Sequence, residues 1–126
     1  MRFLATVKSV EMGVQPPAAL MQAMGKLIQD GMATGVLYET GGLAPAAVGT
    51  YYRIKKGKLT VVDGPYAEAK EVVGGYAILE CASREEAHAW GTRFMQLHVD
   101  NWPEWEGESE LREMHAMAGT NVPARG

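Results

Sequence analysis

The chain has 126 residues, of which 47% are hydrophobic and 21% are charged, and its formal net charge is −3. This composition predicts one globular domain with one core, because a disordered chain would carry far fewer apolar side chains. The acidic balance argues against a nucleic-acid partner, whose phosphates require a surplus of lysine and arginine. Lys55, Lys56 and Lys58 form a basic cluster, which we interpret as a solvated hairpin tip.

The cysteine content and the hydropathy pattern indicate a reducing compartment and no membrane partner. The single cysteine, Cys81, lies in an apolar run and has no internal disulfide partner. Lys8 and Glu11 interrupt the N-terminal stretch before the core of a signal peptide could form. The charge-free run 12–25 contains two prolines and is too short to cross a bilayer. We therefore expect a cytoplasmic protein.

The first part of the chain predicts a strand followed by a helix. Residues 3–10 are rich in β-formers and read as a strand. Pro16 and Pro17 suit the first turn of a helix, where a missing N–H costs nothing. Apolar residues then recur at helical spacing, namely Leu20, Met24, Leu27 and Ile28. Gly31 is predicted to end this helix as a left-handed cap residue.

The middle of the chain predicts a short strand and a β-hairpin. Residues 36–38 form the short extended segment. Residues 50–55 and 59–63 are predicted to pair through a turn at Lys56-Gly57, where glycine supplies the positive φ.

Two glycine pairs are predicted to interrupt the strands around this hairpin. The segment 41–45 contains one pair and a proline, so we expect it to be a loop. The other pair, Gly74-Gly75, precedes a further strand predicted at residues 76–81.

The last part of the chain predicts a second helix and a final strand. Ser83 and Glu86 have the spacing of a capping box, so the helix should begin at Arg84. One face of this helix would cover the sheet with Ala87, Trp90, Phe94 and Leu97. The final strand is expected at about residues 110–117, which places the domain at 1–118 and leaves 119–126 as a flexible tail.

This element order predicts an α+β fold of the ferredoxin-like βαββαβ type with an extra hairpin strand. Two helices would then cover one face of an antiparallel sheet. Adjacent strand positions carry large residues on both sides, as in Phe3 with Leu4, Tyr51 with Tyr52, Val61 with Val62, and Ile78 with Leu79. A half-solvated sheet would alternate more cleanly, so the second face is expected to be buried against another copy in a homodimer.

One segment resembles a known family closely. Residues 63–71 read Asp-Gly-Pro-Tyr-Ala-Glu-Ala-Lys-Glu and are followed by Gly-Gly-Tyr at 74–76. They resemble the D-G-P-(F/Y)-x-E-x-K-E and G-G-(F/Y) pattern of the YCII-related proteins, in particular their DGPF subgroup. The resemblance extends over nearly all of the chain except the tail. It implies a dimeric α+β barrel built from ferredoxin-like halves. We expect no cofactor.

On function the resemblance implies little. Some YCII-related proteins carry a His and Asp pair that is proposed as an acid–base dyad, and a dehydrochlorinase acting on a chlorinated hydroxyquinol resembles them. The first predicted helix of this chain has no histidine, so that dyad is not carried over. DGPF members are often associated with extracytoplasmic-function sigma factors, which implies an accessory or regulatory role by association alone.

Asp63 is the candidate catalytic residue. It ends a strand ahead of Gly64-Pro65, where an aspartate commonly caps a tight turn by accepting backbone N–H bonds, and that structural role explains it fully. The functional alternative places its carboxylate at the mouth of the cleft between subunits. There desolvation could raise its pKa toward that of a general base.

Four other residues near Asp63 and one in the second helix are candidate ligand contacts. Glu68 and Lys70 read as a solvated charged loop, with an anion clamp by Lys70 as the alternative. Tyr66 and Tyr76 could stack on an aromatic ligand, although such tyrosines more often pack in the core. His98, near the end of the second helix, is explained by the helix dipole, with a cleft-facing general acid as the alternative.

The remaining histidines and tryptophans do not indicate a metal site. His88 and His98 are about 15 Å apart along one helix, and His115 has no second ligand at chelating spacing, so no metal is expected. Trp102 and Trp105 are expected to pack over the edge of their own domain or against a partner subunit.

These observations leave two main hypotheses. The first is a small-molecule site in the dimer cleft, in an enzyme of lyase, isomerase or dehalogenase type with Asp63 as its acid–base group. The second is a non-catalytic accessory protein that binds a regulator or a ligand, and a dimer without any site is a third.

Overall fold

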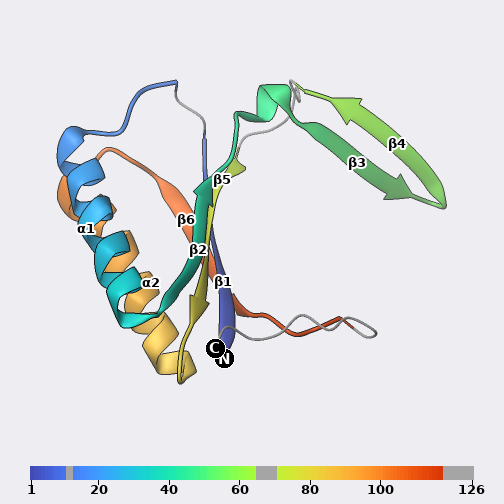
Figure 1. Ribbon diagram of the computed structural model, residues 1–126. Helices are drawn as coiled ribbons and strands as arrows, with labels where there is room; N and C mark the ends of the chain where they lie inside the picture. The colour runs from blue at the N-terminus through green and yellow to red at the C-terminus, as the bar shows by residue number, and fades with distance from the viewer. Residues whose placement is uncertain (11–12, 65–70, 118–126) are drawn as a thin grey trace.

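A computed structural model describes residues 1–10, 13–64 and 71–117 of the chain (Figure 1). The elements are β1 (Arg2–Ser9), α1 (Ala18–Thr34), β2 (Leu37–Gly42), the 3-10 helix η1 (Ala46–Val48), β3 (Thr50–Lys55), β4 (Lys58–Asp63), β5 (Val72–Glu80), α2 (Arg84–Asn101) and β6 (Gly107–Glu113). The tail predicted at 119–126 lies outside the described residues.

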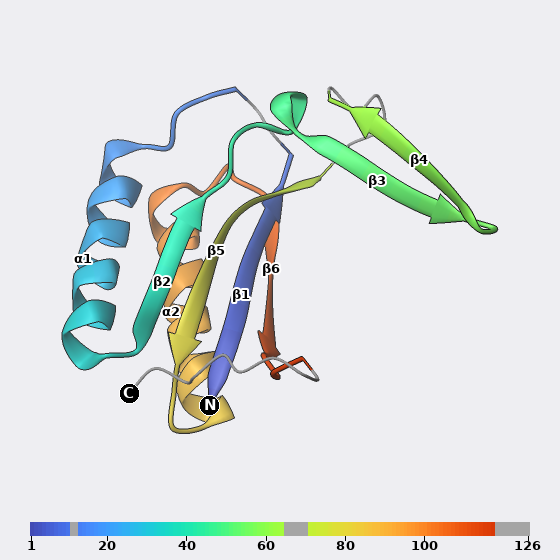
Figure 2. The ribbon, with the colours of Figure 1, turned by 45° about the vertical axis from the view of Figure 1, so that its right-hand side comes forward.

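Four strands form an antiparallel sheet in the order β2-β5-β1-β6, with β5 and β1 in the centre. Both helices lie on one face of this sheet, as Figures 1 and 2 show from two directions. The sheet is therefore built from two strand, helix, strand units, β1-α1-β2 and β5-α2-β6, whose strands alternate across it, and the two central strands come from different units. This confirms the predicted α+β fold of ferredoxin-like type with two helices on one face.

Strands β3 and β4 form a separate two-stranded sheet rather than extending the main one. This hairpin projects from the sheet on the side away from the helices (Figure 1). Its turn has positive φ at both central residues, 51° at Lys56 and 76° at Gly57, as a two-residue type I′ turn requires. The predicted hairpin and its turn are confirmed, but every residue of its two strands is exposed.

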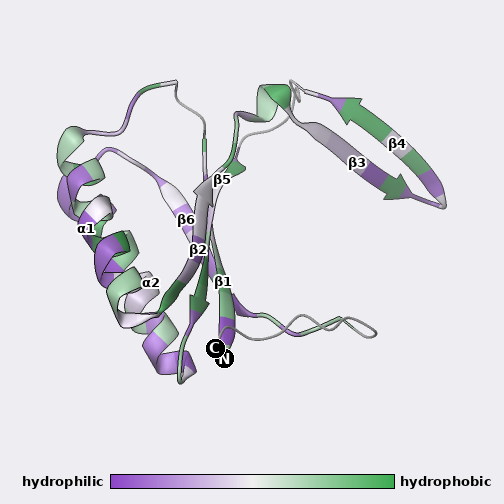
Figure 3. Ribbon diagram, in the orientation of Figure 1, coloured by the Kyte–Doolittle hydropathy of each residue, from purple (hydrophilic) through white to green (hydrophobic). Residues whose placement is uncertain are grey.

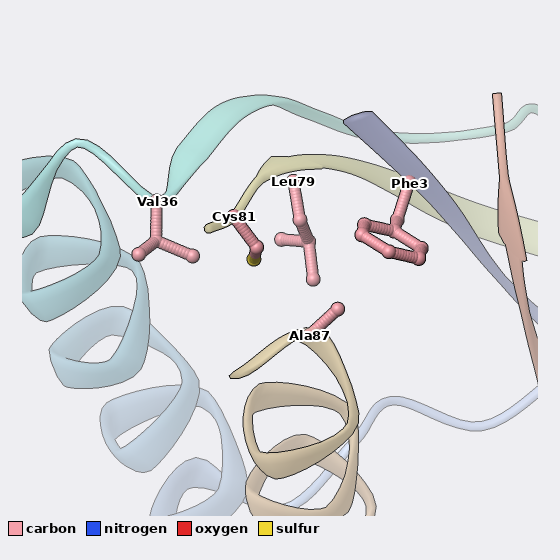
Figure 4. Close-up of a cluster of buried hydrophobic side chains, with 5 residues drawn as sticks. All are labelled: Phe3, Val36, Leu79, Cys81 and Ala87. Atoms are coloured by element: carbon pink, nitrogen blue, oxygen red, sulfur yellow. The ribbon is translucent and has the colours of Figure 1, made fainter. Parts of the chain in front are cut away.

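The core lies between the sheet and the helices (Figure 4). Phe3 of β1 and Leu79 of β5 point toward the helices, and α2 brings Ala87 against them. Val36 and Cys81 complete the cluster at the ends of β2 and β5. Because side chains alternate along a strand, Leu4 and its partner Ile78 point to the opposite face, which no described helix covers.

Helix α1 is longer than the sequence predicts, and Gly31 is not its cap. Gly31 lies inside the helix, where an added Cβ would be 2.9 Å from the Cβ of Leu37. The glycine is needed there because α1 packs closely on β2. The left-handed cap is Gly35, with a φ of 79°. Pro17 precedes the helix as its N-cap instead of lying in the first turn.

The two glycine pairs do not interrupt the strands, contrary to the prediction. Gly41 and Gly42 lie in β2, where they pair with Tyr76 and Gly75 of β5. An added Cβ on Gly41 would lie 3.0 Å from the ring of Tyr76. Each pair thus permits a close approach across the sheet, and the cross-strand hydrogen bonds hold residues that a local pattern assigns to loops.

Helix α2 begins as predicted, whereas the final strand is displaced. The Glu86 N–H donates to Ser83 Oγ at 3.1 Å, which confirms the Ser83 cap. The Glu86 carboxylate helps to raise the pKa of the Cys81 thiol. Strand β6 occupies Gly107–Glu113, three residues ahead of the predicted start at 110. Its pairing with β1, including Ala5 with Leu111, sets these limits.

Candidate functional site

Asp63 closes the base of the hairpin. It ends β4 opposite Thr50 of β3, whose Oγ1 donates to Asp63 Oδ1 at 3.0 Å. The next residue, Gly64, donates its N–H to the Gly49 carbonyl at 2.8 Å. The side chain of Asp63 therefore helps to join the two strands, as the structural interpretation requires. Its carboxylate is also exposed, so it remains available to a ligand or a partner.

Gly64 has its own structural reason for following Asp63. A Cβ at this position would lie 2.3 Å from the Ala46 carbonyl oxygen and 2.6 Å from that of Ala47. Both atoms belong to the backbone of η1 and cannot move aside cheaply. The Asp-Gly pair of the sequence motif is thus tied to the way the hairpin base packs on η1.

One side of the hairpin is apolar from near its base to its tip, and Asp63 lies on this side. The cross-strand pairs Thr50 with Asp63, Tyr52 with Val61, and Ile54 with Leu59 occupy alternate positions and so share one side of the ribbon. We call Tyr52, Ile54, Leu59 and Val61 the apolar arm face. These four side chains are between 53% and 77% exposed. Figure 3 shows hydrophobic residues along β4 and at the end of β3.

Tyr76 lies on the helix-free face of the main sheet and is paired with Glu39. The Tyr76 hydroxyl donates to Glu39 Oε2 at 2.5 Å, and the Thr40 hydroxyl donates to the Tyr76 carbonyl at 2.9 Å. The hydrogen bond to the Glu39 carboxylate raises the pKa of the Tyr76 hydroxyl, and desolvation and the negative charge of Glu39 add to this. The protonated hydroxyl and the carboxylate form a hydrogen-bonded polar pair on this face of the sheet.

His98 lies on the other side of the sheet, in α2, and is 7% exposed. Its ring packs edge-on against Phe94 with the centroids 4.9 Å apart, and against Trp105 at 4.5 Å. Its Nδ1 is 3.1 Å from the Phe94 carbonyl oxygen. Burial lowers the pKa of His98 below its ordinary value, and the hydrogen bond to Phe94 opposes this only partly. The imidazole is therefore neutral at neutral pH.

An open groove of about 790 Å³ lies beside His98, between α2, the connection that follows it, and β6. Trp102 and Trp105 line it from the connection, and their indoles stack with centroids 6.4 Å apart. Polar side chains in its wall include Gln96, Glu106 and Glu108. The two tryptophans therefore pack over the edge of their own domain, as the first of the two sequence interpretations expects.

Cys81 is buried, and its thiol has low reactivity. Desolvation raises the pKa of its thiol to about 11, and the nearby Glu86 carboxylate adds to the effect. The thiol stays protonated at neutral pH and is a poor nucleophile.

The described residues contain neither a metal-type cluster of side chains nor a membrane-spanning helix. Within residues 1–10, 13–64 and 71–117, no three His, Cys, Asp or Glu side chains are grouped as a metal site would require. Neither of the two described α-helices has a stretch that could cross a membrane.

The predicted site residues do not form one cluster in the part of the chain that the structure describes. Asp63 lies at the base of the hairpin, Tyr76 lies on the helix-free face, and His98 lies on the helix-covered side. The other three predicted contacts, Tyr66, Glu68 and Lys70, lie outside the described residues.

Sequence reasoning missed two features of these sites. Glu39 was not singled out, because its partner Tyr76 is 37 positions away and only the register of β2 on β5 brings them together. The groove beside His98 was missed for a similar reason. Its walls come from separate elements, although the aromatic content of residues 102–105 was a usable signal.

Two comparisons with known proteins match this chain. A family model described as the YCII-related domain matches residues 1–96. An uncharacterised protein of Rhizobium meliloti (strain 1021) is 38% identical over 53 residues, which cover 42% of this chain and 43% of that protein. The match thus spans less than half of the length of that relative.

Proposed function

The chain belongs to the YCII-related family, and on this premise we propose that it is a DGPF-type homodimer that binds a small molecule in a cleft between its subunits. In this proposal the cleft forms over the helix-free face of the sheet, and the hairpin of each subunit packs against the other. Asp63 is the acid–base group of an enzyme of lyase, isomerase or dehalogenase type.

The apolar arm face is the observation that carries the proposal. A two-stranded ribbon is at best marginally stable in water, yet β3 and β4 form a separate sheet with four large apolar side chains exposed on one side. Contiguous exposed apolar surface of this kind is typical of interaction sites. A second copy that covers this side would stabilise the hairpin and bury apolar surface in both subunits.

The chemistry assigned to Asp63 follows from its place on the same side of the hairpin. Covering the apolar arm face would remove water from the Asp63 carboxylate, and desolvation disfavours the charged form. The carboxylate could then take a proton from an activated C–H group of a bound substrate. In an elimination, the electron pair of that bond forms a double bond while a halide leaves with its own electron pair. The Tyr76 and Glu39 pair would line the polar part of this cleft.

An Asp63→Asn variant tests the proposal. Asparagine still offers a side-chain oxygen to the Thr50 hydroxyl, so the hairpin base should be kept. Removing a desolvated charge should leave the melting temperature unchanged or higher, while ligand binding and turnover fall. The measurement pairs thermal melts with a screen of small halogenated and carbonyl compounds, and chloride release is assayed with the halogenated members.

The matched control is Asp100→Asn, which changes an exposed carboxylate on α2 that accepts a hydrogen bond from Gln96. This variant should keep every response of the parent. An Asp63→Asn protein that melts clearly lower and keeps all ligand responses would contradict the catalytic role. A dimeric parent that responds to no compound would favour the accessory, non-catalytic alternative.

A further inference from the structure

The hydrogen bond of His98 fixes its tautomer. The Phe94 carbonyl can only accept, so His98 Nδ1 must carry the hydrogen that it donates across 3.1 Å. Because the ring is neutral, Nε2 then has a free lone pair and acts as an acceptor. Packing against Phe94 and Trp105 holds the ring in this orientation. A histidine fixed in this way presents a defined acceptor, as histidines in binding sites commonly do.

The free nitrogen of His98 opens into the groove. The described residues give Nε2 no hydrogen-bond partner, although the side chain as a whole is more than nine-tenths buried. No described side-chain nitrogen or oxygen is both fully buried and unpartnered. Nε2 must therefore reach accessible space, and the groove is the accessible space that His98 lines. Packing alone explains why the ring of His98 is buried, but it provides no hydrogen-bond donor for Nε2.

The wall of the groove selects by shape and by charge. The indoles of Trp102 and Trp105 offer flat aromatic surface beside His98. Three carboxylates, from Glu71, Glu106 and Glu108, also line it, and the described lining residues include no lysine or arginine. Aromatic faces and carboxylates both attract cations, and the three carboxylates would repel an anion. The volume of about 790 Å³ lies within the range of small-molecule sites.

We propose that this groove is a binding site for a small planar aromatic cation, which donates an N–H to His98 Nε2 and stacks on Trp102 or Trp105. The glutamates balance its charge. The site is built within one chain, so it does not depend on the proposed dimer or on Asp63.

Two probes of equal size and opposite charge test this site. Benzamidinium is a planar aromatic cation with N–H donors, and benzoate is its anionic counterpart. We expect benzamidinium to shift the indole N–H resonances of Trp102 and Trp105 in a saturable way, with a Kd on the order of 1 mM for so small a ligand. Benzoate at the same concentrations should leave both resonances unchanged.

Substitution of His98 tests the acceptor. His98→Phe keeps an aromatic ring between Phe94 and Trp105 but removes Nε2, and it should weaken benzamidinium binding by about tenfold or more. His115→Phe, at an exposed position beyond β6, is the matched control and should bind as the parent does. If His98→Phe does not fold, the double variant Glu106→Gln with Glu108→Gln decides, because it should weaken the cation several-fold without altering the core.

Three results would overturn the proposal. The first is equal shifts with both probes, and the second is no saturable shift with benzamidinium in the parent. The third is unchanged affinity in His98→Phe or, if that variant is unfolded, in the glutamine double variant. Loss of cation binding in these variants, with parental binding in His115→Phe, would support the proposal.

Discussion

The thiol of Cys81 is 4% exposed and lies beneath Glu86 at the start of α2. Its raised pKa of about 11 predicts very slow alkylation in the folded protein. At about pH 8 the thiolate fraction would be roughly 100-fold lower than for a thiol of ordinary pKa, and burial slows access further. Mass spectrometry after iodoacetamide treatment, with and without urea, measures this difference. Equal rates in the two conditions would show that the thiol is neither buried nor suppressed.

The raised pKa of the Cys81 thiol also predicts that the folded protein loses stability at alkaline pH. The unfolded thiol loses its proton near 9.0 and the folded thiol near 11, so the folded state holds more protons in that interval. The contribution of the Cys81 thiol to the free energy of unfolding is therefore complete below about pH 9 and is lost as the pH rises toward 11. Cys81→Ala should lack this part of the pH dependence when urea unfolding is compared across the interval.

His98 predicts the opposite dependence, at acidic pH. Burial lowers its folded pKa, so the unfolded chain takes up the proton first, near its ordinary value of 6.5. Its contribution to the free energy of unfolding is complete above that value and is lost as pH falls toward the folded pKa. The carboxylates of Glu71, Glu106 and Glu108, which line the same groove, would favour the protonated ring and limit the loss.

Histidine titration by NMR checks this prediction. The midpoint of His98 should lie below the ordinary histidine value of 6.5. Urea unfolding at about pH 5 and about pH 7.5 should show a larger loss of stability in the parent than in His98→Phe. A His98 midpoint at or above 6.5 would refute the proposed neutral ring and its Nε2 acceptor.

At the level of elements, two glycines of α1 should respond to alanine with opposite signs. Gly25 has open space around its missing Cβ, whereas a Cβ added at Gly31 would lie 2.9 Å from Leu37 Cβ. Gly25→Ala should raise the free energy of unfolding by about 0.5–1 kcal/mol, because alanine loses less conformational entropy in a helix. Gly31→Ala should lower it by about 1–3 kcal/mol through overpacking. Urea denaturation of both variants measures the difference, and stabilisation by Gly31→Ala would contradict the packing of α1 on β2.

The elements that sequence reasoning located well are those whose determinants are local. The Ser83 hydroxyl caps a backbone N–H three residues away, and the hairpin turn depends on Lys56 and Gly57 alone. The order of these elements was sufficient to predict the ferredoxin-like fold, because few topologies accommodate two strand, helix, strand units in one sheet.

The elements that it misplaced depend on contacts across the sheet. Gly41 is required in its strand because the ring of Tyr76 packs over it. Gly31 is required in its helix because the side chain of Leu37 packs against it. Neither contact can be predicted from the residues that flank the glycine in the sequence. The candidate site follows the same rule: Asp63 stood out through its motif, whereas Glu39 became visible only through the register of β2 on β5.

For the whole molecule, the hairpin is the part that stands apart from the core. The main sheet has a core on its helix-covered face, whereas β3 and β4 have no described element packed on their apolar side. The opposite side of the ribbon carries Arg53, Lys55, Lys58 and Thr60 toward the hairpin tip, which suit contact with water, whereas Tyr51 and Val62 near the base are apolar. This two-sided character predicts that the apolar arm face is an interface and that the lysine side stays solvated.

Two pairs of threonine substitutions distinguish these sides while keeping residues that favour strands. Ile54→Thr with Leu59→Thr alters a cross-strand pair of the apolar arm face, and Lys55→Thr with Lys58→Thr alters the neighbouring pair on the opposite side. We expect light scattering at micromolar concentration to give a dimer mass for the parent and for the lysine double variant. The Ile54 and Leu59 double variant should shift toward the monomer, because the apolar arm face loses two of its four large apolar side chains. Circular dichroism of the three proteins should agree, since the core lies elsewhere. A monomeric parent would contradict the homodimer outright, and a dimer that withstands the Ile54 and Leu59 changes would place the interface away from the hairpin.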